Sequence, residues 1–188
     1  MDIEEEKGGQ VLEEQIDKIV ISNLQYSYDK IHKNISSLDH TISRGEKVII
    51  KGPSGIGKST FAKCLCGRLM NYDGSIKIND TYEIKDIDVD SLRKKVIYVG
   101  QDEKLFSGTI RENITGNDNS DVSLEQVLEL TSLKETLTRR TRGIDTMILE
   151  GASNLSGGEK ARIFLARALY KNPDILVIDE TLSSVSEQ

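Results

Sequence analysis

Apolar and polar residues alternate near the start of the chain, over residues 18–28. Ile19 and Ile21 lie two positions apart, as do Leu24, Tyr26 and Tyr28 after a step of three residues, and this is the spacing of an extended segment. A period of two is typical of a half-buried strand. The apolar positions at 42 and 48–50 predict two further strands, with residues 44–46 as the turn between them. The pattern therefore predicts β structure in the first 50 residues.

A spacing of four residues replaces this alternation after residue 58. Phe61, Leu65 and Leu69 recur every four positions and predict a helix over 58–70. Ser123 followed by Gln126 has the pattern of a capping box, which predicts another helix start. A third helix is predicted from about residue 158 to residue 171, because Pro173 prevents it from continuing.

Two short apolar runs, at residues 96–99 and 175–178, have no polar interruption. Such runs are typical of strands that are buried on both faces in a parallel sheet. Strands that alternate with helices along a chain indicate an α/β domain. The length of 188 residues fits one domain on the prior of roughly 100 to 200 residues per domain.

Composition excludes several classes of protein. With 37% hydrophobic and 30% charged residues, the chain is typical of a soluble globular domain. A membrane-spanning helix needs about 20 apolar residues, whereas the longest uncharged stretch has ten residues, 19–28. Cys64 and Cys66 lack a nearby partner for a metal site or a disulfide framework, so we expect both to be small core residues in a reducing cytosol.

The net charge of −6 is concentrated in the first 17 residues, which hold seven acids and one base. The other 171 residues hold 24 acids and 24 bases, so the body of the chain is neutral. We interpret residues 1–17 as an acidic linker or leader and residues 18–188 as the working domain. A neutral body argues against a basic nucleic-acid-binding face, and no nucleic-acid partner is expected.

Residues 52–60 read GPSGIGKST, between an apolar run and the helix of Phe61. This strand, glycine-rich loop and helix make a phosphate-binding loop, in which backbone N–H groups and the helix N-terminus surround a phosphate chain. Lys58 would reach the β- and γ-phosphates, and the Ser59 hydroxyl can bind Mg²⁺. The predicted nucleotide-binding residues are Gly52, Pro53, Ser54, Gly55, Ile56, Gly57, Lys58, Ser59 and Thr60.

A carboxylate at the end of a buried strand should complete this site. Asp179 follows the apolar run 175–178 and can hold Mg²⁺, while the adjacent Glu180 can polarise an attacking water. An Asp–Glu pair after a strand can also be an ordinary solvated loop start. The presence of Lys58 and Ser59 favours the functional interpretation.

Residues 154–159, NLSGGE, form a second anion-binding sequence ahead of the last helix. The backbone donors of Ser156, Gly157 and Gly158 would lie at a helix N-terminus, although a glycine-capped helix start is the alternative. One nucleotide needs only one phosphate cradle. The second cradle therefore suggests that two chains share nucleotides head to tail.

With these motifs in this order, the sequence resembles the nucleotide-binding domain of ABC transporters from about residue 18 to its end. GPSGIGKST resembles the family's Walker A, LSGGE its signature, and ILVIDE its Walker B. The resemblance implies a P-loop NTPase core with a mostly parallel sheet, an N-terminal antiparallel β part, and an inserted helical subdomain at about 102–154. Residues 145–159 are most similar to bacterial exporters of bacteriocins, lantibiotics and other peptides, often fused to a peptidase.

The resemblance also implies roles for single residues. Glu180 takes the place of the catalytic glutamate, and Gln101 takes the Mg²⁺ and lytic-water position in the segment 96–114. Tyr28 resembles the aromatic residue that stacks on adenine, with a core tyrosine as the alternative and Tyr26 as a near neighbour. Phe106 and residues 109–114 are candidates for docking to a transmembrane partner, and ordinary packing is the equal alternative.

By resemblance, two such domains enclose two ATP molecules with Mg²⁺, and closure of the dimer drives transport by an exporter. The expected partners are a second nucleotide-binding domain, identical or different, and a transmembrane domain. The expected location is the cytoplasmic face of the cell membrane. The alternatives are a soluble ABC-type ATPase, for which no coiled-coil insertion or zinc module is visible, and a noncatalytic nucleotide-binding module. A small GTPase is excluded because its N-K-x-D motif is absent.

Two departures from the family pattern bear on activity. Ser186 stands where the family usually has an aspartate, which puts communication between the two sites in doubt. The family's switch histidine lies on a later strand, whereas the two histidines here, His32 and His40, precede the Walker A. We therefore expect a domain shortened at its C-terminus that binds ATP but hydrolyses it poorly.

Overall fold

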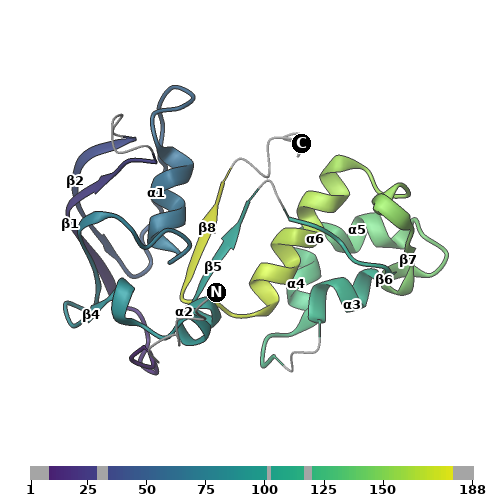
Figure 1. Cartoon of the computed structure of the whole chain (residues 1–188). Coiled ribbons are helices and arrows are strands. Elements are labelled where there is room, and N and C mark those ends of the chain that lie inside the picture. Colours follow the sequence, from purple (N-terminus) through teal and green to yellow (C-terminus); the bar gives the residue numbers. More distant parts are fainter. Residues whose placement is uncertain (1–8, 29–33, 101–102, 117–119, 180–188) are drawn as a thin grey trace, which may run out of the picture. The chain divides into compact units, whose positions relative to one another are not determined.

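The computed structural model describes residues 9–28, 34–100, 103–116 and 120–179. The first half of the chain forms an antiparallel sheet (Figure 1). Its strands are β1 (Lys18–Tyr26), β2 (Ile35–Ser43), β3 (Asp73–Ile78) and β4 (Tyr82–Glu83), in the order β2-β1-β3-β4. Ile19 pairs with Ile78 and Ile21 with Ile76, and all four side chains are buried. The alternation over residues 18–28 therefore predicted β1 correctly.

Three helical segments accompany this sheet. They are α1 (Lys58–Leu65), η1 (Ile84–Asp86) and α2 (Val89–Lys95). Asp88 caps α2, since its side chain accepts a hydrogen bond from the Ser91 N–H at 2.8 Å. The thiols of Cys64 and Cys66 are buried and free, as expected for core cysteines.

The acidic N-terminal segment packs on this sheet unit from residue 9 onward. Gln10 forms a parallel bridge with Ile87, and the Leu12 N–H donates to Ser91 Oγ at 3.1 Å. Leu12 and Ile16 are 2% and 3% exposed. These two apolar side chains anchor a segment whose acidic neighbours remain at the surface.

The chain divides into two compact units, Met1–Val96 and Ile97–Gln188. In the second unit, β5 (Val96–Val99) lies beside β8 (Ile175–Ile178), and β6 (Gly108–Thr109) pairs antiparallel with β7 (Met147–Ile148). The helices are α3 (Ile110–Thr115), α4 (Leu124–Leu130), α5 (Leu133–Thr138) and α6 (Gly157–Tyr170), with the short turns η2 (Gly143–Asp145) and η3 (Glu150–Ala152). The predicted final helix is thus confirmed and begins one residue earlier.

The core of the second unit lies where α3, α4, α5 and α6 meet (Figure 1). Its fully buried side chains include Ile110, Ile114, Val127, Leu133 and Ile163. Arg167 of α6 binds Asn113 of α3. Its Nε donates to the Asn113 carbonyl oxygen at 2.7 Å, and its Nη2 donates to Asn113 Oδ1 at 3.1 Å. No helix within the described ranges combines the length and apolarity that crossing a membrane requires.

Three predicted elements differ from the structure. Residues 48–50 are not a strand, because no strand of the first unit's sheet pairs with them, and Ile49 is 78% exposed. The first helix ends at Leu65 rather than near 70, since Gly67 adopts a left-handed φ of 65°. Ser123 begins α4 but makes no side-chain cap bond, so the capping box predicted there is wrong.

Burial of the two predicted sheet strands is unequal. β5 is largely buried, as its uninterrupted apolar run predicted. β8 is half-buried, and Ile178 at its end is 43% exposed. The expectation of burial on both faces is therefore confirmed for β5 and wrong for β8 in the structure as described.

Candidate functional site

The phosphate-binding loop, residues 52–57, runs into α1. Gly55 and Gly57 have φ of 81° and 102°, in the left-handed region that favours glycine. A Cβ on residue 57 would lie 2.2 Å from the carbonyl oxygen of Asn34. The loop can therefore follow this path only because residue 57 has no side chain.

Lys58 is the first residue of α1, so its side chain starts at the positive end of the helix dipole. Its Nζ donates to the carbonyl oxygens of Gly52 and Pro53, both at 2.9 Å. The ammonium group thus lies over the loop that precedes it. Ser59 follows on the first turn, and Thr60 is buried in the helix.

A cavity of about 540 Å³ adjoins this loop within the first unit. Ile56, Gly57 and Lys58 line one side, and residues of β2, including Leu38 and His40, line another. A pocket that combines apolar walls with two lysines, Lys51 and Lys58, and a helix N-terminus suits an anionic organic ligand.

Tyr26 and Tyr28 are in edge-to-face contact, with ring centroids 4.9 Å apart and an interplanar angle of 78°. Tyr26 is buried at 4% exposure, whereas Tyr28 is 60% exposed. The Tyr28 N–H donates to Asn34 Oδ1 at 3.2 Å, which ties it to the residue that contacts Gly57. The core-tyrosine alternative therefore describes Tyr26, and Tyr28 is the ring that a nucleotide base could reach.

Asp179 lies one residue beyond β8 in the second unit. Its Oδ2 accepts a hydrogen bond from the Tyr98 hydroxyl at 2.8 Å, and its N–H donates to the Val99 carbonyl oxygen at 2.9 Å. Both partners belong to β5, which orients the carboxylate from the neighbouring strand. The two predicted catalytic residues Gln101 and Glu180 lie outside the described residues.

The sequence LSGGE forms the start of α6, as its motif predicted. Ser156 is the N-cap, and its Oγ accepts from the Glu159 N–H while the Glu159 carboxylate accepts from the Ser156 N–H at 2.8 Å. The first-turn N–H groups of Gly157 and Gly158 have no helical carbonyl to bind, because the intrahelical ladder begins after them. The N-terminus of α6 therefore has the free N–H donors and the positive dipole end that an anion-binding site needs.

The turn before α6 is held by contacts that the sequence did not predict. Asn154 accepts from the Leu149 N–H at 3.0 Å and donates to the Met147 carbonyl oxygen at 2.9 Å. Gly151 and Ala152 between them both have a positive φ, of 65° and 52°. Of these features, the sequence could have indicated only the capping box, through the S-x-x-E spacing of Ser156 and Glu159. The equivalent T-x-x-E spacing of Thr109 and Glu112 forms a capping box at the start of α3.

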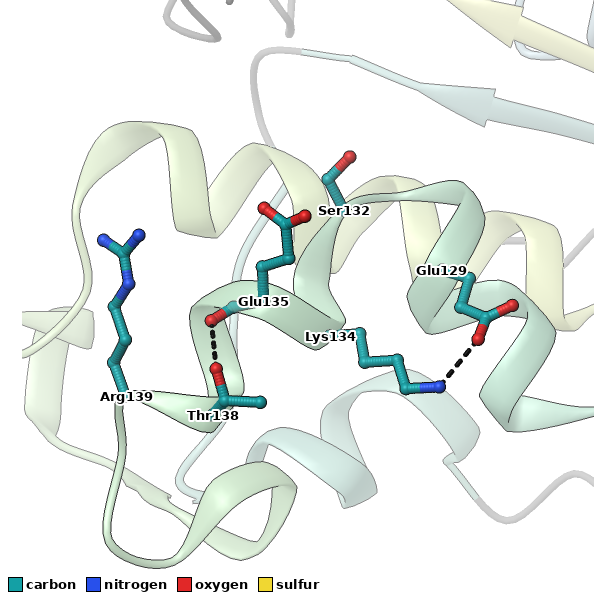
Figure 2. Close-up of a pocket in the computed structure, with 6 residues that line it drawn as sticks. All are labelled: Glu129, Ser132, Lys134, Glu135, Thr138 and Arg139. Atoms are coloured by element: carbon teal, nitrogen blue, oxygen red, sulfur yellow. Dashed lines mark hydrogen bonds and ion pairs between the residues drawn. The ribbon is translucent and has the colours of Figure 1, made fainter.

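A second hollow of about 420 Å³ lies between α4 and α5, and none of the predicted site residues lines it. Figure 2 shows its lining, in which Lys134 Nζ binds Glu129 Oε1 at 2.6 Å and Thr138 Oγ1 donates to the Glu135 carbonyl oxygen at 2.7 Å. Lys134 also pairs with Glu125 at 2.9 Å. The lining carries two acids and two bases, so it offers no excess charge to a ligand.

Each unit, taken by itself, carries donors of the kind that bind Mg²⁺ or phosphate. Ser59 and Asp179 offer hydroxyl and carboxylate oxygens, which Mg²⁺ prefers. The phosphate-binding loop and Lys58 offer N–H donors and a cation. Among the described residues, no group of three or more His, Cys, Asp or Glu side chains is placed to hold a metal ion.

Comparison with known proteins identifies the family to which the chain belongs. A family profile described as ABC transporter matches residues 35–183. A probable microcin-H47 secretion/processing ATP-binding protein and a colicin V secretion/processing ATP-binding protein, both of Escherichia coli, are each 36% identical over 170 residues, 89% of this chain. A solved structure of a bacterial Atm1-family ABC exporter with ATP bound superimposes with a TM-score of 0.85 at 32% identity, covering 96% of this chain.

The chain spans less than one third of the length of these relatives, 24% of each secretion protein and 32% of the solved exporter chain. The matched region contains the phosphate-binding loop, Asp179 and the N-terminus of α6. The fold is the P-loop NTPase fold of these proteins, a mixed α/β structure with an antiparallel N-terminal sheet. The chain belongs to the ABC transporter family, as one of its ATP-binding domains.

Proposed function

We propose that this chain binds and hydrolyses ATP as the energy-coupling domain of an exporter that moves a substrate, such as a peptide, across a membrane. The observation that carries the proposal is the pairing of two anion-binding helix starts in one chain. One is the loop of Gly55, Gly57 and Lys58 at α1, and the other is the N-terminus of α6 at Ser156. The peptide substrate class is supported by the names of the two Escherichia coli secretion proteins.

In this proposal each nucleotide is held by two chains. Lys58 and the loop N–H groups bind the phosphates from one chain, and the exposed ring of Tyr28 stacks on the adenine. Ser156, Gly157 and Gly158 of a second copy, or of a similar domain, close on the γ-phosphate. The second domain is a required partner, because α1 and α6 each offer one phosphate site.

The reaction is in-line attack of water on the γ-phosphate, which needs positioning and charge neutralisation. Lys58 supplies a fixed cation, Glu180 orients the water and accepts its proton, and Gln101 has the Mg²⁺ and lytic-water role that the family resemblance implies. Bound Mg²⁺ would offset the charge that develops on the phosphate oxygens, with Ser59, Gln101 and Asp179 as its candidate protein ligands. Tyr98 keeps the Asp179 carboxylate oriented through the 2.8 Å hydrogen bond.

Docking to a transmembrane partner, which would place the chain at the cytoplasmic face of the cell membrane, would use the surface around Phe106. Phe106, Met147 and Leu149 are 49%, 47% and 56% exposed near the β6–β7 pair. Ile110 and Ile114 are each 1% exposed, so ordinary packing accounts for them. The proposed docking surface is therefore Phe106 with Met147 and Leu149, rather than the whole of residues 109–114.

The 188-residue polypeptide by itself is expected to turn ATP over slowly. Neither His32 nor His40 follows Asp179 in the sequence, so no histidine occupies the family's γ-phosphate-sensing place in this polypeptide. Steady turnover by the purified polypeptide that Glu180→Gln abolishes would contradict this expectation.

Binding of labelled ATP to the polypeptide tests the proposed function. Lys58→Ala should reduce ATP affinity at least tenfold, because it removes the cation at the loop. Lys77→Ala, which removes an exposed lysine of β3, is the matched control and should bind as the unmodified chain does. Equal affinity in Lys58→Ala and the control would overturn the phosphate site.

A further inference from the structure

Arg140 and Glu159 form a half-buried ion pair in the second unit, 19 residues apart. Arg140 Nη2 lies 2.5 Å from Glu159 Oε1, and the two side chains are 21% and 17% exposed. The same Nη2 donates to the Asn154 carbonyl oxygen at 3.1 Å. One guanidinium group therefore joins the residues after α5, the turn before α6, and the first turn of α6.

The other carboxylate oxygen of Glu159 acts on Ser156. Its Oε2 accepts from the Ser156 N–H at 2.8 Å and from the Ser156 hydroxyl at 2.9 Å. The two oxygens of Glu159 thus connect Arg140 on one side with the N-cap serine on the other. Any movement of the Arg140 guanidinium would be passed to Ser156 through a single rigid carboxylate.

Charge gives this connection a role beyond capping. A carboxylate in the first turn of α6 repels an anion that approaches Gly157 and Gly158. Burial raises the pKa of Glu159, but the hydrogen bonds from Arg140 and Ser156 outweigh burial and lower the pKa overall. Glu159 is therefore ionised near neutral pH, and Arg140 is the cation that offsets it.

We infer that Arg140 is a positioning residue for ATP-driven closure: through Glu159 it fixes Ser156, and it neutralises the first-turn carboxylate of α6, which would oppose a γ-phosphate at this N-terminus. The inference rests on the proposed function, because it assigns Arg140 to the phosphate site that α6 presents to a second chain. Arg140 itself does not touch the nucleotide. Its effect is confined to closure and leaves nucleotide capture at α1 unchanged.

The test compares Arg140→Leu, Glu159→Gln and the double variant in the 188-residue chain carrying Glu180→Gln, which prevents loss of ATP. Sedimentation velocity measures the ATP concentration at half-maximal self-association, and a fluorescent ATP analogue measures capture by α1. Arg139→Leu is the matched control, since it removes one exposed positive charge at the neighbouring position. Melting temperatures establish that each variant is folded.

Arg140→Leu is expected to raise the ATP concentration for self-association about tenfold, as for an uncompensated, partly buried charge. Glu159→Gln should need no more ATP than the parent chain, and the double variant should return to within about threefold of it, because the opposing charge is gone. Capture of the analogue should be unchanged throughout. A purely structural pair predicts the reverse, with the double variant as impaired as Arg140→Leu.

Two results would overturn the inference while leaving the proposed function intact: equal self-association of Arg140→Leu and the parent, or no rescue by the second substitution. If Arg140→Leu fails to fold, Glu159→Gln alone decides, since a several-fold higher ATP requirement in that variant contradicts charge neutralisation. A parent chain that binds ATP without associating would instead refute the proposed head-to-tail dimer, and the inference with it.

Discussion

The carbonyl oxygen of Asn34 lies 2.2 Å from the point where a Cβ on residue 57 would sit. Because Gly57 also has a φ of 102°, two independent constraints exclude a side chain there. The Asn34 side chain, through its Oδ1, accepts a hydrogen bond from the Tyr28 N–H. One residue between β1 and β2 thus fixes both the phosphate-binding loop and the backbone of the proposed adenine-stacking tyrosine.

Gly57→Ala should therefore weaken ATP binding at least tenfold, since the loop must move away from Asn34. The left-handed φ and the collision together should lower the free energy of unfolding by about 2 kcal/mol or more. Titration with labelled ATP and urea unfolding measure the two effects.

Gly45→Ala is the matched control, because Gly45 also has a positive φ, of 79°, but no atom lies within 4 Å of the point that a Cβ on this residue would occupy. It should cost about 1 kcal/mol in stability and leave ATP affinity unchanged. Similar ATP affinities for the two variants would show that the contact with Asn34 does not constrain the loop.

Local patterns predicted some of these features and not others. The spacing GPSGIGKST placed Lys58 at the start of a helix, and alternation placed β1, because both signals are contained in a few consecutive residues. The contact between Asn34 and Gly57 joins residues 23 positions apart, and no short pattern encodes it. The pairing of Arg140 with Glu159 was missed for the same reason, since only folding brings the residues after α5 to the start of α6.

The errors also have physical causes. Residues 48–50 have the composition of a strand, but a strand exists only with a partner for its backbone groups, and none pairs with them in the first unit's sheet. Ser123 and Gln126 have the spacing of a capping box, yet the Ser123 side chain makes no cap bond. Spacing permits such contacts, whereas side-chain rotamers and neighbouring elements decide them.

Truncation of Leu12 should destabilise the first unit, because the acidic segment before β1 packs through this side chain. Leu12→Ala is expected to lower the free energy of unfolding by about 2–4 kcal/mol, the range for a fully buried leucine. Val11→Ala is the matched control, since Val11 is 57% exposed, and should change stability by about 0.5 kcal/mol or less. Equal urea midpoints for the two variants would mean that residues 9–17 do not pack as described.

High pH should weaken the first unit through its cysteines. Burial raises the pKa of Cys64 to about 11 and that of Cys66 to about 12, from an ordinary value near 9.0. Between pH 9 and 11 the unfolded chain loses thiol protons that the folded chain retains, so stability falls as pH rises through this window. Urea unfolding at pH 8 and pH 10 measures the fall, and it should be smaller in a Cys66→Ala variant relative to its own stability at pH 8.

The exposed ring of Tyr28 should contribute to affinity for the base and not for the phosphates. Tyr28→Ala is expected to weaken ATP binding about fivefold to tenfold or more, from the loss of one base–aromatic stack worth about 1–3 kcal/mol. Tyr28→Phe keeps the ring and should bind ATP as the parent chain does. Inorganic triphosphate supplies the matched control ligand, because it has no base, and its affinity should be equal in all three chains. A loss of triphosphate binding in Tyr28→Ala would show instead that Tyr28 acts on the loop through Asn34, and equal ATP binding by Tyr28→Ala would exclude the stacking role.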